Sequence, residues 1–306
     1  MQLSFIIPLY NCLPLTQAML ASLRETLPSR LEVEIILVDD GSTDGTRAWL
    51  VNLPAPCRII LNEKNLGFAT ACNRGAAVAT GEFLFFLNND LVLLPRWLEP
   101  MLAAFARFPA AGLVGNVQLN AATGAVDHTG IFFNHLGKPA HDTARPLPAR
   151  LTGYREVTAL TGACCALRRT TWSQLGGFDE GFLNGGEDID FGLRARTAGL
   201  RHYIAVRSVV RHHISASAGR KLRDEENTAR LVQRWRELIT LLAARDWSRH
   251  FIERHWDQSF VYDDSLARAA FYYWLGLLRA PPPGVQAGVN VAIGAELARW
   301  ARLLPA

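Results

Sequence analysis

The sequence contains few cysteines, and their spacing excludes the sites that cysteines usually build. There are five in 306 residues, at positions 12, 57, 72, 164 and 165. Because their number is odd and no two are spaced as C-x-x-C, neither a disulfide framework nor a zinc knuckle is expected. These features are typical of a protein from a reducing cytoplasm.

Long apolar runs and a basic leader segment are also lacking. No uninterrupted apolar stretch reaches the ~20 residues that a membrane-spanning helix needs. The first residues, MQLSFIIPLYN, have no basic segment and are typical of a strand rather than a signal peptide. We therefore expect a cytoplasmic, soluble protein, and the sequence leaves open a peripheral contact with the inner face of the membrane.

A strong net charge is absent as well. The formal charge is +4, and the basic residues are scattered rather than clustered. This distribution argues against a nucleic-acid partner but allows weak attraction to an anionic membrane or a phosphorylated ligand. A chain of this length can form one large domain or one domain with a small appendage, and homo-oligomer formation stays open.

Short apolar runs alternate with helical stretches over the first 120 residues. The runs are rich in Val, Ile, Leu and Phe, as in strands that are buried on both faces of a parallel sheet. Strands are expected at 3–7, 33–38, 57–61, 82–87 and 111–117, and helices at 13–27, 44–52, 67–79 and 95–107, the last with Pro95 in its first turn. The alternation predicts an α/β fold with a mostly parallel central sheet flanked by helices and right-handed crossovers.

The rhythm changes after residue 120. Residues 121–157 have no periodicity, which indicates a long excursion over one face of the sheet. Further elements are expected as a strand at 157–169, a helix at 187–198 that ends at Gly199, and a strand at 201–206. From about residue 223 the pattern is helical, so we expect a domain of residues 1–220 followed by a C-terminal helical extension, 221–306.

Polar segments follow the expected strands at their carboxyl ends, where open α/β sheets bind ligands. The segments are PLYN (8–11), DDGSTDGT (39–46), NEKNLGFATACNRG (62–75) and NND (88–90). All four carry carboxylates or amides where a simple turn needs only Gly or Ser. The sequence therefore predicts a binding site along this edge of the sheet.

Six segments in this order resemble the family 2 glycosyltransferases, which share the Rossmann-like GT-A fold. The segments are FIIPLYN, ILVDDGSTDGT, NLGFATACNRG, FLNND, TGACCALRR and GGFDEGFLNGGEDIDFGLRARTAG, and they extend over about residues 3–217. Within the family, the sequence of these segments is most similar to that of the bacterial rhamnosyltransferase-type members that build surface polysaccharide. The resemblance implies a nucleotide-sugar-binding half, 1–118, and an acceptor-binding half, 119–220. It also implies a UDP- or dTDP-sugar donor and a saccharide or lipid-linked saccharide acceptor.

An aspartate after the second strand can accept the imide N–H of a pyrimidine base, although Asp and Gly-Ser also form ordinary turns. The resemblance assigns the contact with the base to Asp40 rather than to Asp39, and it makes Pro8 and Tyr10 the walls around the base.

The start of the helix at 67–79 is the second part of the expected nucleotide pocket. Asn65 and Gly67 lie where free N–H groups and the helix dipole favour anions. Lys64 or Arg74 could add positive charge toward a diphosphate. The resemblance implies that Asn65 and Gly67 line the pocket.

The segment NND interrupts an apolar run with three polar side chains. A divalent cation that bridges a diphosphate needs hard oxygen ligands, of which the protein usually supplies one or two. The resemblance makes Asp90 a ligand of Mg²⁺ or Mn²⁺, with Asn88 in place of a first acid and Asn89 near the ribose. It also makes a histidine of VRHHISAS (210–217) a further ligand, and the spacing to the serines favours His212.

Three acidic residues begin the helix expected at 187–198. Acids in a first turn complement the helix dipole, and Asp190 with Arg194 forms an i, i+4 pair, so a structural role is a serious alternative. The resemblance implies that Asp188 is the general base of an inverting sugar transfer, with Glu187 orienting it or contacting the acceptor. Thr161 and Gly162 are expected at the edge of the acceptor pocket.

Two other functions are compatible with the same motifs. A sugar nucleotidyltransferase would need a Gly-rich, basic phosphate loop after the first strand, which PLYNCLP (8–14) is not. A non-catalytic nucleotide-sugar-binding protein is the other alternative. The tail segments RLVQRWRELITLLAAR (230–245) and FYYWLGLLR (271–279) indicate either a packed helical subdomain or a helix on a membrane surface.

Overall fold

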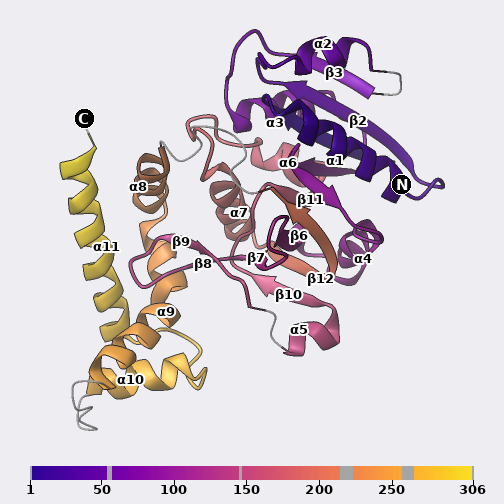
Figure 1. Ribbon diagram of the computed structural model, residues 1–306. Coiled ribbons are helices and arrows are strands. Elements are labelled where there is room, and N and C mark those ends of the chain that lie inside the picture. Colours follow the sequence, from indigo (N-terminus) through magenta and orange to yellow (C-terminus); the bar gives the residue numbers. More distant parts are fainter. Residues whose placement is uncertain (1, 54–56, 145–146, 214–222, 257–264, 305–306) are drawn as a thin grey trace. The chain divides into compact units, whose positions relative to one another are not determined.

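The computed structural model describes residues 2–53, 57–144, 147–213, 223–256 and 265–304 (Figure 1). The chain divides into two compact units. The first unit comprises Met1–Ile131 and His141–Arg223, and the second comprises Phe132–Ala140 and Asp224–Ala306.

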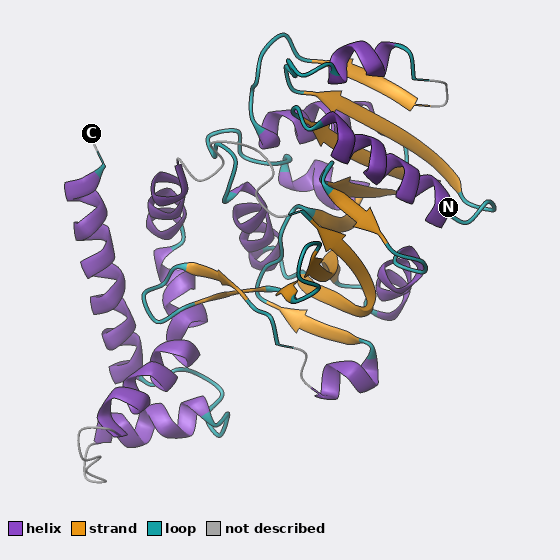
Figure 2. Ribbon diagram, viewed as in Figure 1, coloured by secondary structure: helices purple, strands orange, loops and turns teal. Residues whose placement is uncertain are grey.

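A mixed sheet forms the centre of the first unit, with its strands in the order β10-β12-β6-β11-β4-β1-β2-β3, while β5 pairs with β12 and β7 with β6 (Figure 2). The strands are β1 (Gln2–Leu9), β2 (Glu32–Asp39), β3 (Cys57–Leu61), β4 (Phe83–Leu87), β5 (Leu91–Leu93), β6 (Ala111–Asn120), β7 (Val126–His128), β10 (Tyr154–Val157), β11 (Cys164–Arg168) and β12 (Arg201–His212). β1 pairs in parallel with β2 and β4, β2 with β3, and β6 with β12. β11 is antiparallel to both of its neighbours, β4 and β6.

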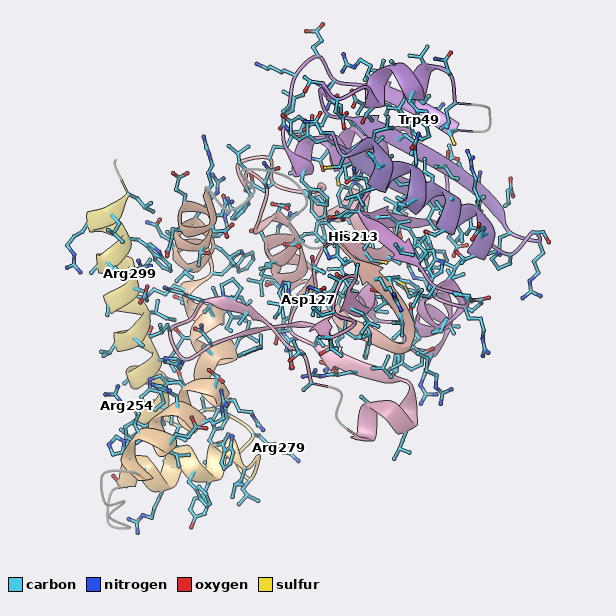
Figure 3. All side chains as sticks on the ribbon, in the orientation of Figure 1. Trp49, Asp127, His213, Arg254, Arg279 and Arg299 are labelled. Atoms are coloured by element: carbon cyan, nitrogen blue, oxygen red, sulfur yellow. The ribbon has the colours of Figure 1, made fainter. Side chains whose placement is uncertain are left out.

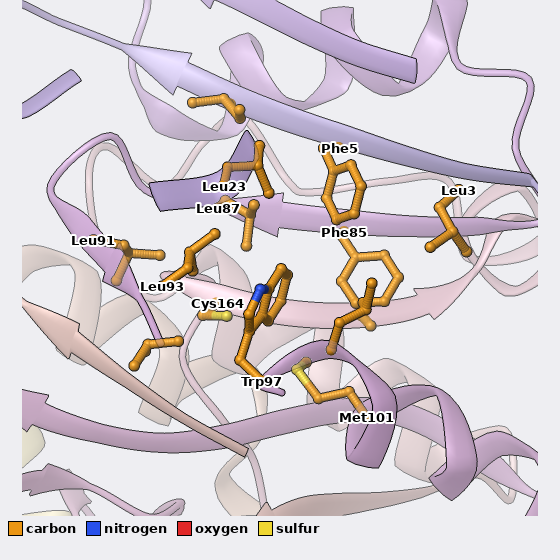
Figure 4. Close-up of a cluster of buried hydrophobic side chains, with 14 of the residues drawn as sticks. Leu3, Phe5, Leu23, Phe85, Leu87, Leu91, Leu93, Trp97, Met101 and Cys164 are labelled. Atoms are coloured by element: carbon orange, nitrogen blue, oxygen red, sulfur yellow. The ribbon is translucent and has the colours of Figure 1, made fainter. Parts of the chain in front are cut away.

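Helices cover both faces of this sheet, and each face has its own apolar core. The helices are α1 (Leu13–Thr26), α2 (Thr46–Val51), α3 (Phe68–Val78), α4 (Leu98–Arg107), α5 (Leu147–Thr152), α6 (Arg169–Leu175) and α7 (Glu187–Thr197). One core takes side chains from α1 and α4 and centres on Phe5, Phe85 and Trp97, whose rings lie 5.2–6.1 Å apart (Figure 4). The other core takes side chains from α3, α6 and α7.

The predicted α/β architecture with a mostly parallel central sheet is confirmed, and the differences are local. Pro95 is not in the first turn of α4, which begins at Leu98, because Arg96 has a φ of 66° and interrupts the backbone before the helix. The strand expected at 157–169 is two strands, β10 and β11. The loop between them supplies residues to the site described below.

The strand expected at 201–206 continues to His212. It does so because β12 pairs with β6 as far as Asn120 and with β5 along its last residues. His212 is therefore the end of a strand rather than part of a loop after it. Residues 214–217 of the same segment lie outside the described residues.

The second unit is helical. Its helices are α8 (Asp224–Arg234), α9 (Arg236–Trp256), α10 (Ser265–Trp274) and α11 (Pro283–Leu303), so the single helix expected over 230–245 is interrupted at Trp235. The unit also holds the turn between β8 (Ile131–Phe133) and β9 (Pro139–His141). Lys138 in this turn lies 2.7 Å from Glu296 of α11 and stacks over the ring of Trp300. No helix within the described ranges is long and apolar enough to cross a membrane.

Candidate active site

A pocket of about 180 Å³ opens at the carboxyl ends of β1, β2 and β4 in the first unit. It brings together side chains from segments that are up to 180 residues apart, from Pro8 to Asp188. The predicted residues that line it are Pro8, Tyr10, Asp40, Asn65, Asn89, Asp90, Thr161, Gly162, Glu187 and Asp188. Gly67, Arg74 and His212 are not among its lining residues.

The two aspartates after β2 differ in their surroundings. Asp39 is fully buried, and its carboxylate accepts hydrogen bonds from Arg47 Nε at 3.0 Å and from the Ser42 N–H at 3.3 Å. Asp40 lines the pocket. The structure therefore assigns to Asp39 the stabilisation of the loop and leaves Asp40 as the carboxylate of this pair that reaches the pocket.

Asp40 also organises the start of α3. Its carboxylate accepts hydrogen bonds from Asn62 Nδ2 (2.7 Å), the Leu66 N–H (2.9 Å) and the Gly67 N–H (2.8 Å). The next N–H, that of Phe68, donates to Asn184 Oδ1 at 3.1 Å. The expectation of a free N–H group is therefore wrong at Gly67 and at Phe68, because protein oxygens already accept from both.

The predicted cation Arg74 has a partner close to this network. Its Nη1 donates to Asn62 Oδ1 at 2.6 Å, and Asn62 in turn donates to Asp40. Arg74 thus acts on the pocket through Asn62, since its own side chain is not part of the pocket wall. A direct contact of Arg74 with a diphosphate stays a prediction.

Asp90 and His212 meet although they are 122 positions apart in the sequence, because β5 pairs antiparallel with the end of β12. Asp90 Oδ1 and His212 Nε2 lie 3.1 Å apart, and both side chains are buried. Despite this distance, neither atom has a partner with hydrogen-bond geometry among the described residues. An oxygen and a nitrogen in this arrangement are suited to share a cation.

The distance between these two atoms fits a common metal ion. Two ligands that are each about 2.1 Å from one octahedral ion, at a right angle, lie about 3.0 Å apart. Within the described part of the chain, no group of three or more His, Cys, Asp or Glu side chains could hold a metal. A cation at Asp90 and His212 would therefore need further ligands from a substrate and from water.

Asn89 is fixed beside Asp90. Its Nδ2 donates to Thr16 Oγ1 at 2.9 Å and to the Asn11 carbonyl at 3.3 Å. The amide nitrogen is therefore used within the protein, and the side-chain oxygen is the group that is left for the expected contact with a ribose.

Two acids at the start of α7 form the opposite wall of the pocket. Asp188 accepts hydrogen bonds from the Gly162 N–H at 2.7 Å and from its neighbour Ile189 N–H at 2.8 Å. Glu187 is buried, and its Oε2 accepts from the Gly185 N–H at 2.8 Å. These bonds fix the orientation of both carboxylates. A side chain at Gly162 would be too tight, since its Cβ would lie 3.2 Å from the ring of Phe68 and 3.4 Å from Asp188 Cβ.

The cysteines near the pocket are unsuited to nucleophilic catalysis. Cys164 and Cys165 are both buried. Burial raises the pKa of Cys164 to about 12, although the hydrogen bond from Asn116 acts in the opposite direction. Burial also raises the pKa values of Cys72 and Cys165 well above the usual value. All three thiols stay protonated at neutral pH, and the thiolate is the reactive form.

Sequence reasoning missed two residues that shape the pocket. Phe68 and Asn184 both line it, and they are joined by the hydrogen bond from the Phe68 N–H. Asn184 has a φ of 59°, in the left-handed region that Asn adopts more readily than most residues. The Asn-Gly-Gly run at 184–186 was the signal that could have indicated a special turn before the acidic helix.

The charged side chains among the described lining residues of the pocket are all acidic. Asp40, Asp90, Glu187 and Asp188 line it, and none of the described lining residues is Lys or Arg. Four carboxylates would repel an anionic ligand unless a cation were bound with it. The residues therefore fit a divalent metal bound together with an anionic ligand.

The chain is similar to known glycosyltransferases and to a protein of O-antigen biosynthesis. The family model described as "Glycosyl transferase family 2" matches residues 4–173. The "O-antigen biosynthesis protein RfbC" of Myxococcus xanthus is 34% identical over 194 residues, which is 60% of this chain but 15% of that protein. The "N-acetylglucosaminyl-diphospho-decaprenol L-rhamnosyltransferase" of Mycobacterium tuberculosis is 30% identical over 69% of this chain and 76% of that protein.

A solved structure shows the same fold. The structure titled "GalNAc-T7 with UDP, GalNAc and Mn2+" superposes with a TM-score of 0.65 at 17% sequence identity, over 87% of this chain and 53% of that one. At this level of identity the likeness establishes the GT-A fold alone.

Proposed function

Because the family model covers residues 4–173, more than half of the 306 residues, the chain belongs to the family 2 glycosyltransferases, and we propose that it is an inverting, metal-dependent one. The donor is a UDP- or dTDP-linked sugar, and the acceptor is a saccharide or lipid-linked saccharide of a surface polysaccharide. The observation that carries the proposal is that Asp40, Asp90 and Asp188 line one pocket at the carboxyl ends of the strands.

Asp40 is suited to recognise the base. An ionised carboxylate offers about four acceptor positions, and three of those on Asp40 are used by Asn62, Leu66 and Gly67. One position is left for the imide N–H of uracil or thymine. Tyr10, which is 36% exposed and lines the same pocket, offers a ring face to the base.

Asp90 and His212 would hold Mg²⁺ or Mn²⁺, with the diphosphate of the donor completing the coordination shell. When bound, the cation would supply Lewis-acid stabilisation of the charge that develops on the leaving diphosphate. The structure of GalNAc-T7 with UDP, GalNAc and Mn2+ supports the proposal that a protein of this fold binds a nucleotide together with a divalent ion.

Asp188 is the proposed base. The acceptor hydroxyl gives its proton to the Asp188 carboxylate while its oxygen bonds to the anomeric carbon. The bond from that carbon to the diphosphate breaks, and its electron pair stays on the diphosphate oxygen. The hydrogen bonds from Gly162 and Ile189 hold Asp188 for this step, and Glu187 orients the turn through the Gly185 N–H.

The class of acceptor is supported by a relative. The Mycobacterium tuberculosis protein is named as a transferase of L-rhamnose to N-acetylglucosaminyl-diphospho-decaprenol, and it is similar over 69% of this chain. A lipid-linked saccharide is therefore the acceptor class that we favour.

The donor site can be tested without knowing the acceptor. The full chain is heated with UDP-, dTDP- or GDP-sugars, with and without Mn²⁺, and the unfolding temperature is measured. We expect a pyrimidine nucleotide sugar to raise it only with Mn²⁺, and Asp90→Asn to remove that increase. Asp127→Asn, at an acid outside the pocket, serves as the control.

Two results would overturn parts of the proposal. Stabilisation by GDP-sugars alone would exclude the role given to Asp40. An equal increase for Asp90→Asn and for the control would exclude the metal site.

A further inference from the structure

The last turn of α10 and the turn that follows it in the second unit carry an unusual group of exposed apolar side chains. We call Tyr272, Trp274, Leu275, Leu277 and Leu278 the apolar tip. Their exposed fractions are 47%, 38%, 50%, 68% and 37%. Single exposed apolar residues are common, but five large ones within seven positions are a dense group, and groups of exposed apolar side chains mark interaction surfaces.

The backbone of the tip is well defined. α10 ends with hydrogen bonds from the Gly276 N–H to the Tyr273 carbonyl and from the Leu277 N–H to the Tyr272 carbonyl, with Gly276 at a φ of 81°. This is a Schellman ending, which turns the chain sharply after the helix. The exposed leucines therefore project from a fixed turn, and α11 begins at the last proline of the rigid run 281–283.

Arginines surround the apolar tip. Arg268 and Arg279 are exposed, and Arg279 directly follows Leu278 (Figure 3). Arg245 of α9 lies over the ring of Tyr273, 5.3 Å from its centroid. Between Ser265 and Ala295 the sequence contains no Asp or Glu. The tip thus combines apolar side chains with the positive charge of Arg268 and Arg279 on either side of it in the sequence.

We propose that the apolar tip binds the surface of an anionic lipid bilayer. Tyr and Trp favour the interface between headgroups and acyl chains, and leucines can insert just below it. Arginines at the rim attract anionic headgroups. A protein partner would leave the positive rim without a function unless that partner were acidic, whereas an anionic bilayer matches both features.

This inference goes beyond the proposed function and does not depend on it. Lipid binding is measured without donor, metal or acceptor, so a failed transferase assay and a failed lipid assay are separate results. If both proposals hold, the tip recruits the enzyme to the surface that contains a lipid-linked acceptor.

The test is cosedimentation of the full chain with vesicles of phosphatidylcholine, with and without phosphatidylglycerol. The wild-type chain is expected to bind the anionic vesicles preferentially and to dissociate in high salt. Leu277→Asp is expected to weaken binding at least about tenfold, since one leucine is no longer buried and a negative charge is added. Its thermal unfolding is measured in parallel and should not change, because Leu277 is exposed.

Matched variants separate the tip from a general effect of charge. Leu151→Asp changes an exposed leucine of α5 in the first unit, with an exposed fraction of 72%, and is expected to bind like the wild type. The double variant Arg268→Glu with Arg279→Glu should lose the preference for anionic vesicles, whereas Arg30→Glu, at an exposed position in the first unit, should keep most of it.

Three results would overturn the proposal. One is equal binding of the wild type and Leu277→Asp. Another is an absence of vesicle binding by the wild type. The third is a dimer that Leu277→Asp dissociates while vesicles have no effect, since the tip would then face a second copy of the chain.

Discussion

Among the described residues, the first unit buries polar groups without hydrogen bonds, and the second unit exposes large apolar groups. Both differ from the usual distribution of side chains, but in opposite ways. The first unit gathers carboxylates in a pocket and buries Asp90 and His212 without hydrogen bonds between them. The second unit exposes large apolar side chains beside arginines. Buried polar groups without partners and exposed apolar groups both cost free energy, so each is retained more readily where a ligand compensates for it. The difference indicates chemistry in the first unit and attachment in the second.

The largest effect is expected from Asp188→Asn, which removes the proposed base while keeping the size of the side chain. The turnover rate should fall by about 10²–10⁴, the usual contribution of general base catalysis. Binding of the donor with Mn²⁺ should stay within a factor of about three, because Asp188 is not assigned to the nucleotide or the metal. Turnover and donor affinity are measured side by side, with Asp127→Asn as the control. Normal turnover in Asp188→Asn would exclude Asp188 as the base.

A second prediction concerns acid stability and the buried His202 of the first unit. Burial lowers the pKa of His202 to about 4 from 6.5, although its hydrogen bond to the Gly192 carbonyl opposes the shift. Between these two values the unfolded chain binds one proton more than the folded chain, so stability falls as the pH decreases from 6.5 to 4. The loss attributable to this residue is about 3 kcal/mol.

His202→Gln should make the dependence of unfolding free energy on pH less steep in that window. His213→Gln, at an exposed position, should leave the slope unchanged. The measurement is urea unfolding at a series of pH values. Part of the slope should remain in His202→Gln, because burial also lowers the pKa of His128. Identical slopes for wild type and His202→Gln would contradict the prediction.

A matched pair of glycine substitutions compares the two units directly. In Gly41→Ala the new Cβ would lie 2.6 Å from the Lys64 carbonyl carbon, at a φ of 81°, whereas in Gly288→Ala it would lie 2.1 Å from the Trp247 ring. Each should reduce the unfolding free energy by about 1–3 kcal/mol.

The two glycine variants should differ in donor binding, measured by calorimetry with Mn²⁺ present. Gly41→Ala should weaken it, because the displaced backbone leads into Asn65, which lines the pocket. Gly288→Ala should bind the donor normally while it stays folded. Equal losses of donor affinity in the two variants would contradict the assignment of donor binding to the first unit alone.

The smallest effect is expected for Lys138→Met in the second unit. Lys138 pairs with Glu296 at 2.7 Å, and the pair is partly exposed, so its loss should cost no more than about 1 kcal/mol. Thermal unfolding of Lys138→Met is compared with that of Lys64→Met, which changes an exposed lysine of the first unit. A larger decrease in unfolding temperature for Lys64→Met than for Lys138→Met would argue against the role of Lys138 in joining residues 132–140 to α11.

Sequence patterns predicted the strands and helices of the first unit well, because buried apolar runs and helical periodicity are local properties. They placed Pro95 in the first turn of a helix, and this was wrong because the positive φ of Arg96 is not visible in a hydrophobic pattern. They also predicted free N–H groups at the start of α3. Asp40 accepts from the Gly67 N–H and Asn184 from the Phe68 N–H, and Asn184 does so from a loop more than 100 residues further along the chain.

The sequence by itself determined the α/β class, the family and most of the polar residues at the strand ends, because these depend on which residues follow one another. Only the tertiary structure decided that Asp90 and His212 lie 3.1 Å apart, and that Asn184 lies at the start of α3. It also brought residues 132–140 together with the C-terminal helices in one unit. These features depend on strand pairing and packing between distant segments, and such contacts leave no periodic signal in the chain.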